Sequence, residues 1–292
     1  MQNLGFLALL GIVTALTVME HTPTRRGRGV LPDGRRVETW ACQLQGADFM
    51  ELLGLDVSLL VVDPDDSKLT REQVEALKLG GKVVLAYMSV GAAEEWREYW
   101  REEWRETPPD WLAEPDPMWP GSHLVKFWRR EWGEILRSRL DGIIQRGYDG
   151  VYLDVVDAYR EWEARGVWHA REMVIELVAA LSKYAKGKNP NFIVIPQNCP
   201  ELIVDTRFAE AVDGLGMESL WYIYDRPRRE AEVAWALRYL DRVVEMGKLV
   251  LVIDYVTVPS EIRNFFKKAR KRGYIPYVGT LKLDRIGYYE PP

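Results

Sequence analysis

The sequence predicts a (β/α)8 TIM barrel formed by a single domain, and three observations support this fold class. Several short runs are almost continuously apolar (SLLVV, KVVLAY, FIVI and LVLVI), which is typical of parallel strands covered on both faces. About eight such runs alternate with helical patterns along the chain, as a barrel requires. No G-x-G-x-x-G or P-loop follows any of these runs, which disfavours a nucleotide-binding open sheet.

Nine segments have the composition of strands, and five helical patterns lie between them. The expected strands are 40–44, 57–63, 83–89, 124–128, 151–156, 192–197, 212–218, 249–255 and 274–279. The expected helices include 70–79, 132–145, 170–184, 229–246 and 260–271. Thr70 and Gln73 have the spacing of a capping box, which marks the start of the first of these helices. An eight-stranded barrel leaves one of the nine strands outside, and the pattern does not identify which one.

Composition describes a folded globular protein whose ligand is not a nucleic acid. Of the 292 residues, 47% are hydrophobic and 28% are charged, and the net charge is -5, so no basic surface for nucleic acid is expected. The three histidines form no H-x-x-H or H-E-x-x-H arrangement. We therefore expect no metal and no cofactor. Cys42 and Cys199 are expected to be free thiols, and the protein is expected to be a monomer.

The first residues resemble an export or anchoring segment. Residues 4–18 form an unbroken run of apolar or small side chains, with the length of a signal-peptide core and short for a membrane span. We expect a signal peptide or membrane tether over 1–20, a polar linker over 21–38 and the barrel over 39–292. The location would then be extracellular, or tethered to a membrane and facing outside. The alternative is an apolar N-terminal helix packed on the domain.

Polar side chains gather where the expected strands end, which is where barrel active sites form. Four strands end in acid, at Asp63, Asp154, Glu218 and Asp254. One such carboxylate is explained by helix capping, whereas four around one ring indicate a site. The expected substrate-binding residues are Asp63, Tyr87, Ser89, Tyr152, Asn198, Tyr222, Asp254 and Tyr255.

Alternation of side chains along a strand selects two of these acids as the catalytic pair. Asp154 shares a strand face with Tyr152, and Glu218 shares one with two glycines that leave room inside the barrel. Asp157 has the opposite parity and lies past the strand, so we expect it to cap a helix or to make a hydrogen bond to the next loop. Strands two apart are separated by roughly 9–10 Å, and inward-leaning carboxylates would close this gap to about 5–6 Å. Retaining glycosidases have carboxylates about 5–5.5 Å apart.

The connection over 92–132 carries seven of the twelve tryptophans. Trp96, Trp100 and Trp104 recur at helical spacing, and such a stripe usually serves packing. Trp111 and Trp119 lie among prolines in loop-like sequence, so they are the better candidates to stack on a sugar at the barrel mouth. For any one of these tryptophans, packing is still the favoured role.

Five segments resemble one known family. They are WACQLQ (40–45), LLVVD (59–63), LAYMSVG (85–91), YDGVYLDVVD (148–157) and GMES (216–219). In this order they resemble the endo-alpha-1,4-polygalactosaminidase family, glycoside hydrolase family 114. The resemblance covers roughly residues 38–285, and YDGVYLDVVD is its most specific part. It implies a (β/α)8 barrel acting on alpha-linked galactosaminoglycans, with the nucleophile at Asp154 and the acid/base at Glu218. The tryptophan-rich connection departs from the family pattern.

The sequence therefore predicts a glycoside hydrolase that cleaves an alpha-linked amino-sugar polysaccharide with retention of configuration. Its partner is a polysaccharide or oligosaccharide substrate. An acidic mouth suits a partly cationic glycan. Two alternatives stand beside this prediction: a sugar-binding barrel without catalysis, and metal-dependent hydrolysis by the ring of carboxylates.

Overall fold

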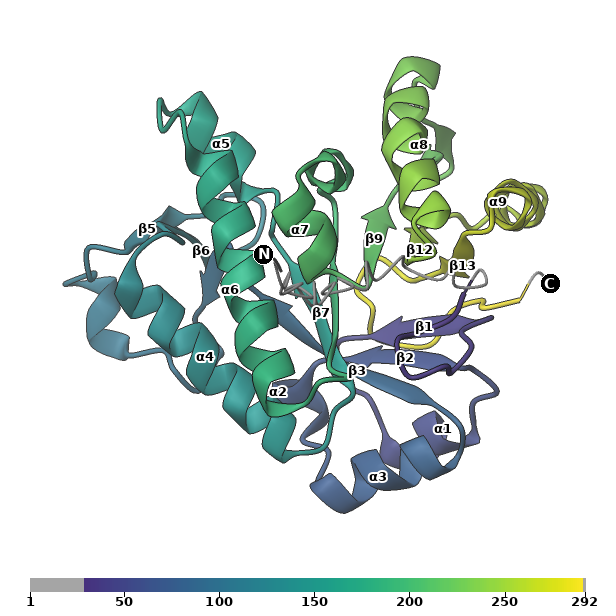
Figure 1. The fold of residues 1–292 in the computed structure, drawn as a ribbon, viewed down its shortest axis with the longest axis horizontal. Helices are drawn as coiled ribbons and strands as arrows, with labels where there is room; N and C mark the ends of the chain where they lie inside the picture. The colour runs from purple at the N-terminus through teal and green to yellow at the C-terminus, as the bar shows by residue number, and fades with distance from the viewer. Residues whose placement is uncertain (1–28, 291–292) are drawn as a thin grey trace, which may run out of the picture.

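A computed structural model describes residues 29–290 and confirms the barrel fold (Figure 1). Eight parallel strands form its wall: β1 (Trp40–Gln43), β2 (Leu59–Val62), β3 (Val83–Ser89), β7 (Gly150–Asp154), β8 (Ile193–Pro196), β9 (Gly214–Glu218), β12 (Leu249–Asp254) and β13 (Ile275–Val278). Five of them are hydrogen-bonded in the order β1-β2-β3-β7-β8, and the other three in the order β13-β12-β9. All the paired neighbours in these two sheets are parallel.

The two sheets meet at both edges. Between β8 and β9, Gln197 forms a parallel bridge with Gly216, and the amide of Asn198 donates to the carbonyl of Gly216 at 3.1 Å. Between β13 and β1, side chains make the connection: Trp40 Nε1 donates to the carbonyl of Ile275 at 2.8 Å, and the Tyr277 hydroxyl to the carbonyl of Cys42 at 3.2 Å. These contacts bring β13 back to β1, so the strands surround a common interior.

Helices cover the outside of the strands. They are α1 (Phe49–Gly54), α2 (Pro64–Ser67), α3 (Arg71–Leu79), α4 (Arg130–Gln145), α5 (Ala158–Ala164), α6 (Ala170–Lys188), α7 (Thr206–Ala211), α8 (Glu230–Glu245) and α9 (Pro259–Arg272), with short 3-10 turns η1 (Glu102–Arg105) and η2 (Pro200–Val204). The five predicted helices are confirmed as α3, α4, α6, α8 and α9. The predicted capping box of Thr70 and Gln73 is also confirmed.

The strand predicted over 124–128 is the one outside the barrel. It corresponds to β6 (Ser122–Val125), which pairs antiparallel with β4 (Ala92–Glu94) and β5 (Leu112–Pro115). Figure 1 shows β5 and β6 set apart from the barrel strands, beyond the helices α4 and α6. A second small element, β10 (Tyr222–Ile223) with β11 (Arg226–Pro227), follows β9.

The tryptophan-rich connection is folded differently from the prediction. Residues 96–104 form turns rather than an α-helix, because Trp100 stacks against His123 and Trp104 against Trp111, at ring distances of 4.9 and 5.0 Å. Trp111 is only 4% exposed and stacks on Trp132 at 5.1 Å. The prediction of Trp111 as a sugar-stacking residue is therefore wrong, since its ring is used in packing. Trp119 is 66% exposed.

Part of the predicted linker packs against the barrel. Leu31 and Val37 are buried, and Arg35 pairs with Asp149 at 2.9 Å, directly before β7. The predicted signal or tether over 1–20 lies outside the described residues. Within residues 29–290, no helix has both the length and the apolar composition needed to span a membrane.

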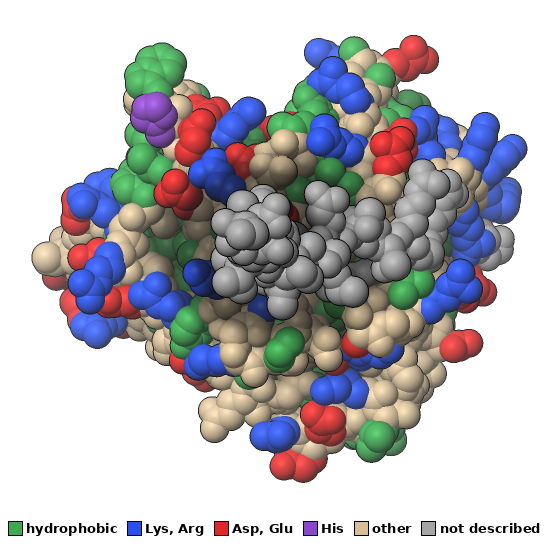
Figure 2. Space-filling view, viewed as in Figure 1, with side chains coloured by type: hydrophobic (Ala, Val, Ile, Leu, Met, Phe, Trp, Pro, Cys, Tyr) green, Lys and Arg blue, Asp and Glu red, His purple; other side chains and the backbone are tan. Residues whose placement is uncertain are grey.

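One outer helix concentrates positive charge. The helix α9 exposes Arg263, Lys267, Arg270 and Lys271, and Figure 2 shows blue Lys and Arg side chains gathered over this helix. Carboxylates instead collect at the strand ends. Because the cations of α9 are exposed on the outer wall, water and salt screen them from the buried carboxylates.

The packing of the connection generates a first prediction. We expect Trp111→Ala to destabilise the fold by about 3–5 kcal/mol, because it leaves a cavity beside the rings of Trp104 and Trp132. Trp119→Ala, at an exposed position of the same connection, should change stability by less than about 0.5 kcal/mol. Urea unfolding of both variants measures the difference, and equal stability of the two variants would contradict the packing role of Trp111.

Candidate active site

Asp154, the last residue of β7, is held by donors from three strands. The Tyr87 hydroxyl on β3 donates to Oδ2 at 2.6 Å, and Gln197 Nε2, directly after β8, donates to Oδ1 at 2.5 Å. The amide of Val155 donates to the same Oδ1 at 2.7 Å. Charge-assisted hydrogen bonds of this kind are short and directional. Both carboxylate oxygens are therefore fixed in orientation.

Residues with a left-handed backbone conformation follow the ends of three neighbouring strands at this point. Val155, Asn198 and Ser219 have φ values of 55°, 60° and 50°, and they follow Asp154, Gln197 and Glu218 respectively. Such a conformation is strained for a β-branched valine, and strain of this sort clusters at functional sites. A Cβ on Gly91 would lie 2.1 Å from the carbonyl oxygen of Val155. Gly91 is thus required for the turn that presents Asp154.

Glu218, the last residue of β9, has a separate set of partners. The Tyr255 hydroxyl donates to Oε1, and Asn198 Nδ2 donates to Oε2 at 3.2 Å. Asn198 also accepts the Glu218 amide through its Oδ1 at 3.0 Å. The left-handed conformation of Asn198 thus places its amide side chain on both the backbone and the carboxylate of Glu218.

The surroundings of Glu218 favour its protonated form. Burial raises the pKa of Glu218, and the negative charge of Asp154 raises it further, against the opposing effect of Tyr255 and Asn198. The two carboxyl groups are close enough to interact electrostatically, and they stand on strands separated only by β8. Asp154 accepts three hydrogen bonds, whereas Glu218 has a raised pKa. Acid/base chemistry requires two carboxyl groups in different surroundings of this kind.

The space below the pair is filled by an aromatic floor. Tyr152 is 3% exposed and packs on Trp40 at 6.0 Å, which in turn packs on Tyr277 at 5.5 Å. A Cβ on Gly216 would lie 2.1 Å from the Tyr152 hydroxyl. The room that the glycines of β9 leave inside the barrel is therefore taken by Tyr152. This burial does not support the predicted role of Tyr152 as a sugar contact.

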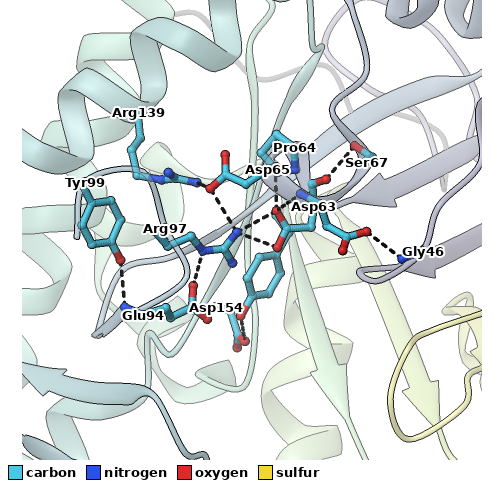
Figure 3. A network of polar contacts seen from close by, with 12 residues as sticks. Gly46, Asp63, Pro64, Asp65, Ser67, Glu94, Arg97, Tyr99, Arg139 and Asp154 are labelled. Carbon is cyan, nitrogen blue, oxygen red and sulfur yellow. Dashed lines mark hydrogen bonds and ion pairs between the residues drawn. The ribbon is translucent and has the colours of Figure 1, made fainter. Parts of the chain in front are cut away.

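A buried ionic network extends from the site toward α2 and α4 (Figure 3). Arg97 donates to both oxygens of Asp63 at 2.7 Å and to Glu94 at 2.5 Å. Asp65 joins through Arg97 at 3.2 Å and Arg139 at 2.8 Å. Burial raises the pKa of Glu94, although Arg97 opposes the shift. Cations and carboxylates therefore compensate one another inside the protein, as buried charges require.

Arg97 links this network to the candidate nucleophile. Its guanidinium carbon lies 5.7 Å from the centre of the Tyr87 ring, within the range of a cation–π contact. The hydroxyl of the same ring donates to Asp154. Burial raises the pKa of Tyr87, and Asp154 adds to the shift, so the hydroxyl keeps the proton that it donates. No pattern in the sequence pointed to Arg97, because its segment was expected to carry a helical stripe of tryptophans.

Four of the predicted substrate-binding residues are engaged in structural contacts instead. Asp63 pairs with Arg97 and caps α2 through the amide of Asp65 at 2.9 Å. Asp254 is 0% exposed and accepts three backbone amides, from Leu220, Trp221 and Tyr222. Successive side chains of a strand point to opposite faces. The Tyr255 hydroxyl reaches Glu218, so the side chain of the preceding Asp254 points the other way, toward the loop after β9.

The hydroxyls of the remaining two make hydrogen bonds to groups other than the carboxylate pair. The Ser89 hydroxyl donates to the carbonyl of Ala92 at 3.0 Å. The Tyr222 hydroxyl accepts from Asn264 of α9 at 2.7 Å and is buried beside that helix. Direct sugar contact is thus unsupported for Asp63, Ser89, Tyr222 and Asp254. Tyr87, Asn198 and Tyr255 do converge on Asp154 and Glu218.

Asp157 lies in a different environment from the one predicted. It occupies the N-cap position of α5, but its side chain makes no capping hydrogen bond. The strand alternation on which the parity argument depends ends at Asp154, because Val155 is left-handed. Burial raises the pKa of Asp157 to about 6, with an opposing effect of Arg160 and a further rise from Asp154. Asp157 therefore belongs to the electrostatic surroundings of the pair.

Both cysteines are free and buried. In the part of the chain that the structure describes, no group of three or more His, Cys, Asp or Glu side chains is arranged to hold a metal ion.

A parallel barrel whose strand ends bring together two carboxyl groups with different hydrogen-bond partners defines a glycosidase-like class of protein. The sequence profile of glycoside hydrolase family GH114 matches residues 21–291. The chain belongs to this family.

Relatives of similar length exist in archaea and bacteria. The uncharacterized protein MJ1477 of Methanocaldococcus jannaschii is 39% identical over 265 residues, covering 84% of this chain and 76% of its own length. An uncharacterized protein of Thermotoga maritima is 34% identical over 272 residues, covering 87% and 84%.

Two solved structures share the fold at low sequence identity. The glycoside hydrolase domain of PelA from Pseudomonas aeruginosa is 20% identical, with a TM-score of 0.71 over 87% of this chain and 98% of that domain. Ega3 of Aspergillus fumigatus, solved in complex with galactosamine, is 18% identical, with a TM-score of 0.70 over 90% of this chain and 100% of Ega3.

The aromatic floor generates a second prediction. A methyl group at Gly216 would overlap the buried Tyr152 ring, which cannot move without disturbing Trp40. We expect Gly216→Ala to destabilise the fold by about 1–3 kcal/mol through overpacking.

Tyr152→Phe is the matched variant, because the Tyr152 hydroxyl is buried without a hydrogen-bond partner in the described part of the chain. Its stability should equal or exceed that of the wild type. Thermal unfolding compares the two variants. A stable Gly216→Ala protein would show that Tyr152 does not fill the space above Gly216.

Proposed function

We propose that this protein hydrolyses alpha-glycosidic bonds in an amino-sugar polysaccharide and retains the anomeric configuration. Asp154 acts as nucleophile and Glu218 as acid and base. One observation carries the proposal: in a chain of family GH114, these two carboxyl groups end strands two apart and have unequal surroundings. Galactosamine in the Ega3 structure supports an amino sugar as the substrate.

In the first step, an oxygen of Asp154 attacks the anomeric carbon while Glu218 gives its proton to the leaving glycosidic oxygen. Tyr87 and Gln197 hold the attacking carboxylate at a fixed angle. The raised pKa of Glu218 keeps its proton available to a higher pH than that of an ordinary glutamic acid. This step forms a covalent glycosyl-enzyme ester and releases the first sugar product.

In the second step, Glu218 is ionised and removes a proton from water, which attacks the anomeric carbon and breaks the ester to Asp154. Tyr255 and Asn198 stabilise the ionised form of Glu218 through their hydrogen bonds. Two inversions at one carbon restore the original configuration. The enzyme then returns to its starting protonation state.

The proposed substrate is a polymer, and this supports an extracellular location. A polysaccharide does not cross a membrane unaided, and the apolar run over 4–18 has the length of an export signal. We therefore propose that the barrel acts outside the cell, alone or attached to a membrane.

The third prediction concerns the acid pair. In Asp154→Asn, the Tyr87 hydroxyl can rotate to accept from the new amide, so the fold should persist while the nucleophile is lost. Glu218→Gln should lower kcat by about 10²–10⁴-fold, because it removes the proton donor. Asp154→Asn should lose at least as much. Hydrolysis of alpha-1,4-linked galactosamine oligosaccharides measures both effects, with unfolding curves as the control for structure.

Proton NMR of the first product tests the stereochemistry. An alpha product agrees with retention by a covalent intermediate. A beta product would make Asp154 the general base of an inverting reaction. Undiminished activity in Asp154→Asn would overturn the proposed mechanism, and a wild type that binds the glycan without cleaving it would indicate a sugar-binding barrel.

The fourth prediction concerns pH. Glu218 must be protonated for the first step, so kcat/KM should fall as pH rises through its pKa, which burial and Asp154 raise above the usual glutamic acid range. Glu218→Gln should lose this alkaline limb, because the amide does not titrate. Initial rates between pH 4 and pH 9, conditions chosen around the reference value of about 4.3 for Glu, provide the test. A limb that persists in Glu218→Gln would assign the proton to another group.

A further inference from the structure

Asp157 differs from the other aspartates at helix N-cap positions. Asp48, Asp63 and Asp205 each accept backbone amides of the helix that they precede, which is the usual structural reason for an Asp at this position. Asp157 makes no such bond, although it precedes α5. Its side chain is 37% exposed, so it is open to a ligand while lying beside the candidate site.

The cation next to Asp157 is already bound elsewhere. Arg160 donates to the two oxygens of Glu201 at 2.8 and 2.9 Å and to the carbonyl of Asn198 at 3.1 Å. Its contact with Asp157 is longer, at 3.5 Å. Most of the hydrogen-bonding capacity of Asp157 thus remains unused. Arg160 fixes the position of α5 against the end of β8 and leaves the Asp157 carboxylate without a short ion pair.

The electrostatic surroundings of Asp157 suit a positively charged ligand. Asp154 on β7 acts on it as a negative charge, Glu218 on β9 adds to this effect when it is ionised, and Arg160 on its own helix acts as a positive charge. Two negative neighbours and partial burial make the ionised Asp157 unfavourable by itself. A cation bound among these carboxyl groups would relieve that repulsion, whereas a neutral hydroxyl or acetamide would not.

We infer that Asp157 determines specificity by binding the ammonium group of a 2-amino sugar next to the bond that is cleaved. In such a sugar the nitrogen is carried by the carbon adjacent to the anomeric carbon. A residue three positions after the nucleophile, on the turn that follows it, lies in the right region to reach this substituent. The inference rests on the proposed function, because it takes Asp154 as the residue that attacks the anomeric carbon.

The experiment compares two substrates that differ only at nitrogen. Initial rates are measured on alpha-1,4-linked galactosamine oligosaccharides and on the same oligosaccharides after N-acetylation. The wild type should prefer the amine. Asp157→Asn should lower kcat/KM for the amine by about 10–100-fold, as expected when a hydrogen bond between charged groups is lost. For the acetylated substrate the change should be within about threefold.

A pH series adds a second readout. The pKa of Asp157 is about 6, so the preference for the amine should weaken as pH falls below that value and Asp157 takes up a proton. The pH at which the preference changes also depends on the charged neighbours of Asp157, which are Asp154, Glu218 and Arg160. In Asp157→Asn the preference should be lost at every pH.

Asp205→Ala and Asp157→Ala form a matched pair of controls, because both aspartates stand at N-caps. Asp205→Ala loses the bond to the Arg207 amide, so its melting temperature should fall by a few degrees while its preference for the amine is unchanged. Asp157→Ala should show the reverse. Its melting temperature should not fall, because an aspartate whose pKa is raised by folding destabilises the native state once pH exceeds its pKa.

The outcomes separate the inference from the proposed function. Equal losses on both substrates in Asp157→Asn, or no loss on either, would overturn the role of Asp157 while leaving Asp154 and Glu218 as the catalytic pair. Failure of the wild type to cleave either substrate would overturn the proposed function. In that case calorimetry still tests the role of Asp157, by measuring how tightly the galactosamine oligosaccharide binds to Glu218→Gln with and without Asp157→Asn. An affinity about 10–100-fold weaker in the double variant supports the role of Asp157. Equal affinities overturn it.

Discussion

The hydrogen bonds on the carboxylate of Asp154 are the interaction on which the rest of the site depends. They join β3, β7 and β8 at one point, through Tyr87 and Gln197. Because both oxygens are engaged, the orientation of the carboxylate is set by three strands rather than by its own rotamer preference. The barrel therefore prepares the geometry of attack before a substrate binds, which reduces the reorganisation needed in the reaction.

Close approach of backbone and side chains makes this geometry possible, and glycines permit it at two places. Gly91 allows the strained turn at Val155, and Gly216 allows the ring of Tyr152 to lie beneath Glu218. Neither contact contributes a catalytic group. Both decide where Asp154 and Glu218 stand, so substitutions at Gly91 or Gly216 should act on the proposed chemistry through the positions of these two acids. The positive φ of Val155 is a cost in stability that the surrounding packing offsets.

Ion pairs hold the periphery of the site in place. Arg97 compensates Asp63 and Glu94 behind Tyr87, and Arg160 compensates Glu201 behind Asn198. Each arginine thus supports a residue that holds one of the two acids: Tyr87 holds Asp154, and Asn198 holds Glu218. Buried pairs of this kind add little net stability against an apolar alternative, but breaking one leaves a charge without its partner. Their effect here is to fix Tyr87 and Asn198, and through them the two acids.

The amino-acid sequence by itself determined the fold and the positions of the two acids. Continuous apolar runs are typical of strands covered on both faces, and the alternation of side chains selects Asp154 and Glu218 at their ends. Tertiary structure decided what lies around them. Alternation stops at the left-handed Val155, so no period in the sequence could tell that Asp157 leaves its helix uncapped and lies beside the pair. The contacts of Arg97 and the burial of Trp111 likewise join segments far apart in the chain, and local patterns carry no information about such distances.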